Sequence, residues 1–257
     1  MTVFTHSATD RTIDHADVAQ FDVPDDDWWS TRGVTGWLHK YNPVRVAYTR
    51  AAACTRFGRD PSRSNCLHGL SVLDIGCGGG VFCEPLAQLG ARVVGIDPAP
   101  NAIKVASGHA RETGVQIDYR CTTAEALADG GDRFDLVLAM EVIEHVADSD
   151  VFVQHCAALV KPGGLILLST INRTFKSYAF AIVMGEYILR LLPRGTHQWR
   201  KFRTPSEIEA AMKRNDLWVS DIAGVTMNLA TRTLQLSPDT AVNYLLTAQR
   251  PINSDIG

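Results

Sequence analysis

Short apolar runs alternate with amphipathic stretches from residue 70 onward. The apolar runs are bounded by glycine, proline or acidic residues and predict buried strands, whereas the stretches between them predict helices. Strands are predicted at 71–76, 91–97, 115–121, 134–140 and 164–170, with helices up to Leu89 and near 100–112, 124–128 and 149–160. Five strands that alternate with helices in this way indicate a parallel sheet covered on both faces.

The pattern changes after this series. Residues 204–216 (TPSEIEAAMKRND) have the sequence of a capped helix. Residues 217–225 and 241–249 are short and rich in apolar residues, so they predict two closing strands.

The region before the series is different again. Asn42-Pro43 resembles a helix start and predicts a helix from Tyr41 to Phe57. We expect residues 1–65 to form an N-terminal helical cap or lid, and residues 66–257 to form one domain with an insertion near 171–203.

Composition and charge are those of an ordinary globular protein. The 257 residues are 46% apolar and 21% charged, which allows a sizeable core. A net charge of -3 gives no reason to expect a nucleic-acid partner. The six cysteines form no CxxC pair and the N-terminus shows no targeting signal, so we expect reduced thiols in a cytoplasmic protein.

The glycine-rich segment DIGCGGG (74–80) follows the first predicted strand and is the strongest candidate site. In an open parallel sheet, ligands bind beyond the carboxyl ends of the strands. The glycines permit a tight turn and expose bare backbone at the start of the next helix. Their spacing does not fit the dinucleotide fingerprint, because neither frame ends in Gly or Ala. An acid, Asp74, two residues before Gly76 suits S-adenosylmethionine better than a pyrophosphate cofactor.

Asp97 ends the second predicted strand, 21 residues after Gly76. An acid at this position can accept hydrogen bonds from both ribose hydroxyls of a cofactor. It can also cap the helix that begins near Pro98. The preceding glycine turn favours ribose binding.

Further segments follow the order of one family's motifs. LVKPGG (159–164) is typical of a whole methyltransferase superfamily, whereas the more specific segments are DWWS (27–30), LHKYNPVRVAY (38–48), EVIEHV (141–146), STINRT (169–174), EYILRLLPRGTHQWRKF (186–202) and VNYLL (242–246). The chain therefore resembles the class I methyltransferases, and within them the ubiquinone-biosynthesis O-methyltransferase family, over residues 12–248. Ser30 departs from the acid that the family often has there. The resemblance implies a Rossmann-like α/β fold with a seven-stranded, mostly parallel sheet and helices on both faces.

The resemblance also implies which residues contact S-adenosylmethionine. They are Arg45, Gly76, Asp97 and Met140, to which the glycine turn adds Asp74 and Gly78. Arg45 can form a bidentate pair with the cofactor carboxylate, and Met140 can line the adenine or sulfonium side with its thioether. Without the resemblance, Arg45 would be a solvated helix charge and Met140 a core residue.

The substrates that the family implies are phenols, namely a polyprenyl hydroxyphenol and demethylubiquinol, each methylated on oxygen. A phenol with a pKa near ~10 needs a general base or a metal to become nucleophilic at neutral pH. On a helix, Glu141, Glu144 and His145 would share one face, where a catechol oxygen and Mg2+ could meet. They could instead serve the helix dipole and the fold. The metal dependence known in the family favours Mg2+ as a second cofactor and makes His145 a catalytic candidate.

His197 in RGTHQW is the second catalytic candidate. A histidine near its reference pKa of ~6.5 can accept the phenol proton at neutral pH. It could equally be a loop histidine with a structural hydrogen bond, and the sequence leaves both alternatives open.

Residues 171–203 carry seven Lys or Arg and one acid, whereas residues 1–30 carry seven Asp and one Arg. The basic segment includes an apolar stretch, 175–192, that charged residues interrupt, so it does not predict a membrane-spanning helix. It could pack on the sheet or lie on an anionic membrane that holds the polyprenyl substrate. We expect peripheral association with the inner membrane and contact with other quinone-biosynthesis enzymes.

Two other functions compete with this interpretation. One is methylation of another phenol or of a carboxylic acid, because superfamily motifs do not choose the substrate. The other is a cofactor-binding scaffold without catalysis. Because Arg45, the glycines and the acids of EVIEH are all present, the sequence favours an enzyme.

Overall fold

The computed structural model describes residues 12, 28–31, 35–178, 199–228, 231 and 233–252. The strands are β1 (Ser71–Ile75), β2 (Arg92–Asp97), β3 (Asp118–Cys121), β4 (Phe134–Met140), β5 (Val160–Ile171), β6 (Trp218–Asn228), β7 (Thr233–Ser237) and β8 (Asn243–Gln249). The helices are α2 (Gly36–Arg56), α3 (Cys83–Gln88), α4 (Pro100–Thr113), α5 (Ala124–Asp129), α6 (Ser149–Leu159), α7 (Phe175–Ser177), the 3-10 helix η2 (Trp199–Lys201) and α8 (Pro205–Arg214).

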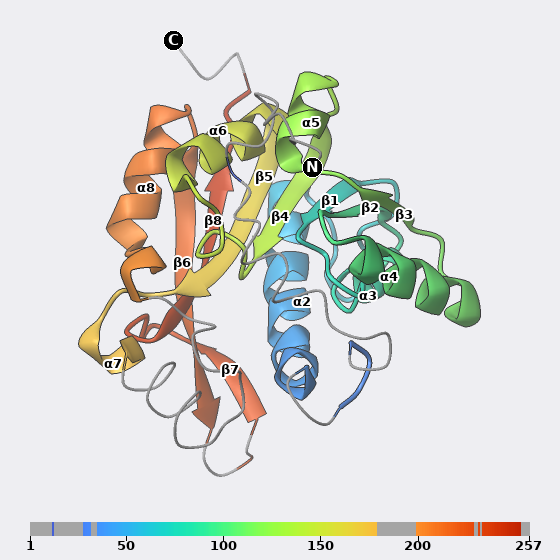
Figure 1. The fold of residues 1–257 in the computed structure, drawn as a ribbon, viewed down its shortest axis with the longest axis horizontal. Coiled ribbons are helices and arrows are strands. Elements are labelled where there is room, and N and C mark those ends of the chain that lie inside the picture. The colour runs from blue at the N-terminus through green and yellow to red at the C-terminus, as the bar shows by residue number, and fades with distance from the viewer. Residues whose placement is uncertain are drawn as a thin grey trace, which may run out of the picture.

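The strands of the described chain form one sheet in the order β3-β2-β1-β4-β5-β8-β6-β7 (Figure 1). Strands β1 to β5 are parallel, and β8 runs antiparallel to both β5 and β6. The strand order reverses at β1, so the carboxyl ends of β1 and β4 flank the crevice where such sheets bind ligands. The predicted α/β fold and its five parallel strands are confirmed.

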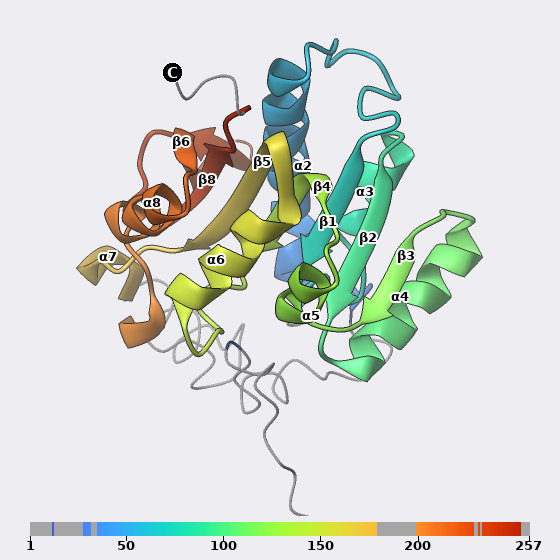
Figure 2. The ribbon, with the colours of Figure 1, turned by 90° about the horizontal axis from the view of Figure 1, so that it is seen from above.

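Each central strand contributes side chains to two separate cores. In β4, Leu136 and Leu138 belong to one core, and Val137 and Ala139 belong to the other, because successive side chains of a strand point to opposite faces. Helices α2 and α3 pack in the first core, and α5, α6 and α8 pack in the second. Figure 2 shows α2 and α6 on opposite sides of the sheet.

The helix α2 begins earlier than the sequence predicted. It starts at Gly36, so Pro43 lies inside the helix and not at its start. An interior proline removes one backbone hydrogen bond and costs about 3 kcal/mol in an exposed helix. Burial of Tyr41, Val44 and Tyr48 in the first core offsets this cost.

The sheet has eight strands and not the predicted seven. The additional strand is β7, which pairs with the second half of β6 at the edge of the sheet. Its five residues are partly or fully exposed, so they lack the strong apolar alternation of a buried strand. The predicted capped helix at 204–216 is confirmed as α8, where Thr204 and Glu207 form a capping box.

No helix of the described residues is long and apolar enough to cross a membrane.

Candidate active site

The glycine turn joins β1 to α3 at the carboxyl edge of the sheet. Gly76 and Gly78 have positive φ angles of 69° and 51°, a region that favours glycine. A Cβ at Gly76 would lie 2.6 Å from Val142 Cγ2, and a Cβ at Gly78 would overlap the indole of Trp28. Both positions therefore require glycine for conformation and for space.

Asp97 ends β2 directly beside this turn. Its carboxylate accepts hydrogen bonds from the Gly78 amide at 3.0 Å and from the Ala99 amide at 2.8 Å. The turn and the start of the next helix are thus both tied to one side chain. A carboxylate has about four acceptor positions, so a side chain of this kind can accept hydrogen bonds from ribose hydroxyls as well as from backbone amides.

Asp74 is buried at the end of β1, with 2% of its surface exposed. The Cys83 thiol donates to its carboxyl group at 3.1 Å. Burial raises the pKa of Asp74 to about 7, although the thiol and Arg45 both favour the charged form. The cysteine partner was not predicted, because spacing alone does not show that the first turn of α3 folds back over β1.

Arg45 projects from α2 into the site and is 5% exposed. Its Nη2 lies 3.2 Å from Glu141 Oε1, and its guanidinium lies over the Tyr41 ring at 4.4 Å. Its Nε is buried and has no acceptor in the described part of the chain. Arg45 is therefore not a solvated helix charge, and it retains a donor for a ligand.

Glu141 and Glu144 follow β4 and are held by neighbouring β5. Ser169 Oγ donates to Glu141 at 2.7 Å, and Thr170 Oγ1 donates to Glu144 at 2.8 Å. Glu144 is fully enclosed, and its burial together with the negative charge of Glu141 raises its pKa well above the usual range. Burial and the neighbouring charge thus both favour the protonated form of Glu144.

The predicted helix at EVIEH is wrong. Residues 141–148 form a turn, in which the His145 amide donates to the Val142 carbonyl at 2.9 Å and Glu141 has a φ of 57°. Glu141, Glu144 and His145 therefore do not share a helix face. Within the described ranges, no group of three or more His, Cys, Asp and Glu side chains could hold a metal ion.

The structure describes only one of the two remaining predicted residues. Met140 ends β4 and is 8% exposed in the core that also contains Tyr41, so it packs as a core residue at the edge of the site. His197 lies outside the described residues.

The comparisons with known proteins agree with this geometry. Residues 45–220 match the sequence model of a methyltransferase domain. A ubiquinone biosynthesis O-methyltransferase from Methylobacterium nodulans is 51% identical over 244 residues, which cover 95% of this chain and 98% of the relative. The chain belongs to this family. A ubiquinone biosynthesis O-methyltransferase from Brucella anthropi is 50% identical over 93% of the chain and 97% of its own length.

A solved structure shares the fold at lower identity. Magnesium protoporphyrin IX methyltransferase from Synechocystis PCC 6803 with bound SAH has a TM-score of 0.61 and 20% identity, covering 87% of this chain and 90% of its own. The enzyme is therefore an S-adenosylmethionine-dependent methyltransferase of the class I fold.

The residues of the site fit S-adenosylmethionine. The glycine turn lies at the carboxyl edge of the sheet, and Asp97 beside it offers carboxylate acceptors. The buried Nε of Arg45, which has no acceptor among the described residues, offers a donor for a carboxylate. The predicted Mg2+ ligands Glu141, Glu144 and His145 do not fit a metal ion, because the described residues contain no group of three such side chains that could hold one. No step of the reaction is therefore assigned to a metal.

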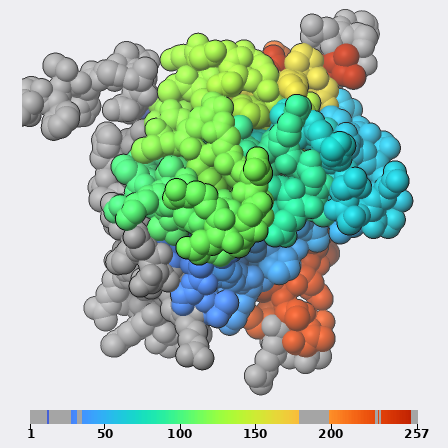
Figure 3. All heavy atoms as spheres, turned by 90° about the vertical axis from the view of Figure 1, so that its right-hand side faces the viewer, coloured from blue at the N-terminus to red at the C-terminus, as the bar shows by residue number. Residues whose placement is uncertain are grey.

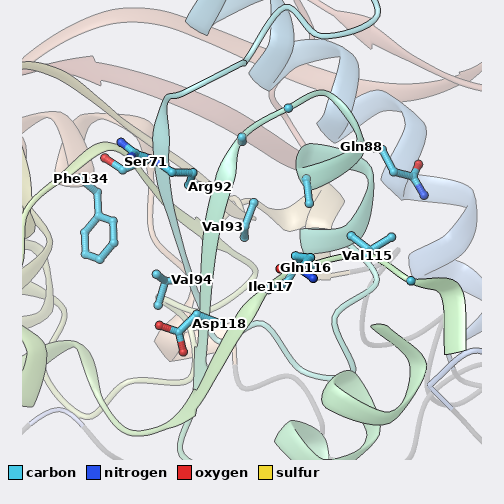
Figure 4. Close-up of a pocket in the computed structure, with 14 residues that line it drawn as sticks. Ser71, Gln88, Arg92, Val93, Val94, Val115, Gln116, Ile117, Asp118 and Phe134 are labelled. Atoms are coloured by element: carbon cyan, nitrogen blue, oxygen red, sulfur yellow. The ribbon is translucent and has the colours of Figure 1, made fainter. Parts of the chain in front are cut away.

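A hollow in the described part of the chain lies elsewhere. It is lined by residues at the starts of β1, β2 and β3, among them Ser71, Arg92, Val93 and Asp118 (Figure 4). These are the amino ends of the strands, opposite the glycine turn. The hollow is thus not the cofactor site.

Proposed function

We propose that the enzyme methylates phenolic oxygens of ubiquinone precursors, namely a polyprenyl hydroxyphenol and demethylubiquinol. The observation that carries this proposal is the 51% identity over 95% of the chain with a ubiquinone biosynthesis O-methyltransferase. S-adenosylmethionine supplies a methyl group already activated on a sulfonium. The residues of the chain then need to bind the cofactor, align the phenol with the methyl group and remove the phenol proton.

Labelled S-adenosylmethionine and a short-chain demethylubiquinol test this proposal. We expect label in the methyl ether of the quinol and none in an added aromatic carboxylic acid of similar size. Label in the carboxylic acid alone would favour the competing methyltransferase function. Cofactor binding by calorimetry without transfer to either compound would favour the scaffold.

Asp97 is proposed to bind the ribose. Asp97→Ala should weaken S-adenosylmethionine binding by about 1.5–3 kcal/mol, the usual value for hydrogen bonds to a charged group. Calorimetry on the folded variant measures the change. Asp118→Ala is a matched control, because Asp118 is an exposed acid on β3 that pairs with Arg120. Equal affinity in the Asp97 variant and the control would contradict the assignment.

His197 is proposed as the base that accepts the phenol proton. His197→Ala should lose turnover at neutral pH and partly recover it at alkaline pH, where solvent deprotonates the phenol. His155→Ala serves as the control, because His155 lies on α6, which supplies none of the proposed cofactor or substrate contacts. Loss of turnover on adding a chelator, with His197→Ala still active, would assign the role to a metal instead.

The segment 175–203 is proposed to contact an anionic membrane. Phe175, Tyr178 and Trp199 flank its undescribed part and are 84%, 41% and 41% exposed. Aromatic residues beside basic ones favour membrane interfaces. We expect sedimentation with anionic vesicles that weakens as salt rises, since each basic residue near the surface contributes about 1 kcal/mol. Equal sedimentation with neutral vesicles would show that electrostatic attraction does not contribute to membrane binding.

A further inference from the structure

Two adjacent tryptophans, Trp28 and Trp29, lie on the glycine turn. They belong to the N-terminal segment, of which the structure describes residue 12 and residues 28–31. A Cβ at Gly79 would approach Trp28 Cγ to 2.6 Å, and one at Gly78 would meet the six-membered ring of the same indole. The Trp28 indole thus spans both glycines. In Figure 3, the blue surface of the N-terminal part of the described chain borders the green surface of later segments.

Trp29 binds this segment to the glycine turn and to α4. Its Nε1 donates to the Gly79 carbonyl at 3.0 Å, and its indole stacks on His109 with ring centroids 3.4 Å apart and planes 8° from parallel. His109 Nδ1 lies in turn 2.6 Å from the buried carboxylate of Glu84 on α3. The stack therefore joins the N-terminal segment to α4 and α3.

Two further contacts hold the same segment. His39 Nε2 lies 3.0 Å from the Trp28 carbonyl, which links the tryptophans to α2. Farther upstream, Thr12 donates its amide to Glu125 at 2.8 Å and accepts from the Ala147 amide at 2.9 Å. The segment is thus anchored beside the glycine turn and also beside the turn that follows β4.

The Trp28 side chain has an unused donor. Its Nε1 is buried and finds no acceptor among the described residues, although a buried donor without a partner is costly. A ligand oxygen at this position would satisfy it. The face of an indole also attracts a cation, and S-adenosylmethionine carries one on its sulfonium.

We propose that Trp28 is a fixed wall of the S-adenosylmethionine pocket, and that Trp29, His109 and Glu84 are positioning residues that hold it there. The alternative is a plug that the cofactor displaces. A plug would require either the packed Trp28 indole to rotate out of place each time the cofactor binds, or the whole segment to give up the Trp29 stack, the Gly79 hydrogen bond and the His39 contact. The wall keeps all three. This inference concerns the cofactor and does not depend on which phenol is methylated.

Calorimetry on three variants tests the wall. Trp28→Leu should weaken S-adenosylmethionine binding about tenfold or more, which corresponds to loss of a desolvated cation–aromatic contact. S-adenosylhomocysteine, which has no sulfonium charge, should lose less affinity. Trp28→Phe keeps an aromatic face and should restore most of the affinity for S-adenosylmethionine. Trp218→Leu is the control, because Trp218 lies on β6 and is 73% exposed.

A second measurement tests the positioning residues. His109→Ala should increase quenching of tryptophan fluorescence by acrylamide and weaken cofactor binding, whereas His109→Phe, which keeps the stack but loses the Glu84 contact, should restore both only in part. Circular dichroism checks that each variant is folded. Unchanged or tighter cofactor binding in folded Trp28→Leu would show a plug or an uninvolved side chain and would overturn the proposal.

Discussion

Gly78→Val is expected to abolish measurable binding of S-adenosylmethionine while most of the fold remains. The φ angle of 51° disfavours a β-branched residue, and the new Cβ would overlap the Trp28 indole. The Gly78 amide would also shift away from Asp97, to which it donates at 3.0 Å. One substitution thus disturbs the turn, the acid beside it and the tryptophan above it. Calorimetry measures the binding, and far-ultraviolet circular dichroism measures the fold.

Gly108→Ala is the matched control for this variant. Gly108 lies inside α4, and no atom would come within 4 Å of its added Cβ. Alanine in place of a helical glycine should stabilise the protein by about 0.5–1 kcal/mol and leave cofactor binding unchanged. Normal binding in the valine variant would mean that the cofactor does not approach this turn.

Arg45→Met is expected to lower the free energy of unfolding by about 1–3 kcal/mol, because it leaves the half-buried Glu141 carboxylate without its partner. Methionine keeps much of the volume, but Glu141 loses its cation and Tyr41 loses the guanidinium above its ring. Urea unfolding measures the loss of stability.

An exposed ion pair provides the comparison. Arg214 Nη2 lies 2.6 Å from Asp150 Oδ1, and the two side chains are 57% and 66% exposed. Arg214→Met should therefore lower the free energy of unfolding by less than about 1 kcal/mol. Similar losses in the two variants would show that the Arg45 pair is not a buried network.

The order and type of most elements could be predicted because local periodicity decides them. The β1 to β5 series and α8 have apolar spacing and caps that stand out in a single sequence. Pro43 misled the prediction for α2, because tertiary burial there outweighs the local cost of an interior proline. The edge strand β7 was missed because a mostly exposed strand carries little apolar pattern.

The site could be predicted where it depends on glycine-rich backbone and on the ends of strands. The glycine turn and Asp97 follow from the ends of two adjacent parallel strands. The conformation of the EVIEH segment (141–145) could not be predicted, because residues three and four positions apart can meet in a turn as well as in a helix. Ser169 and Thr170 on β5 decide its shape. The contact between Trp29 and His109 is equally long-range, so no local spacing indicates it.

The anchoring of Thr12 has a consequence for how the chain folds as it is synthesised. Thr12 and its partner Glu125 are 113 residues apart, and its other partner, Ala147, is made later still. Trp28 and Trp29 likewise leave the ribosome well before Gly79 and His109. Closing such long loops is slow compared with forming local helices. Thr12, Trp28 and Trp29 therefore dock only after much of the sheet has been synthesised, and a nascent chain cannot complete its cofactor pocket until the strands through β4 are paired.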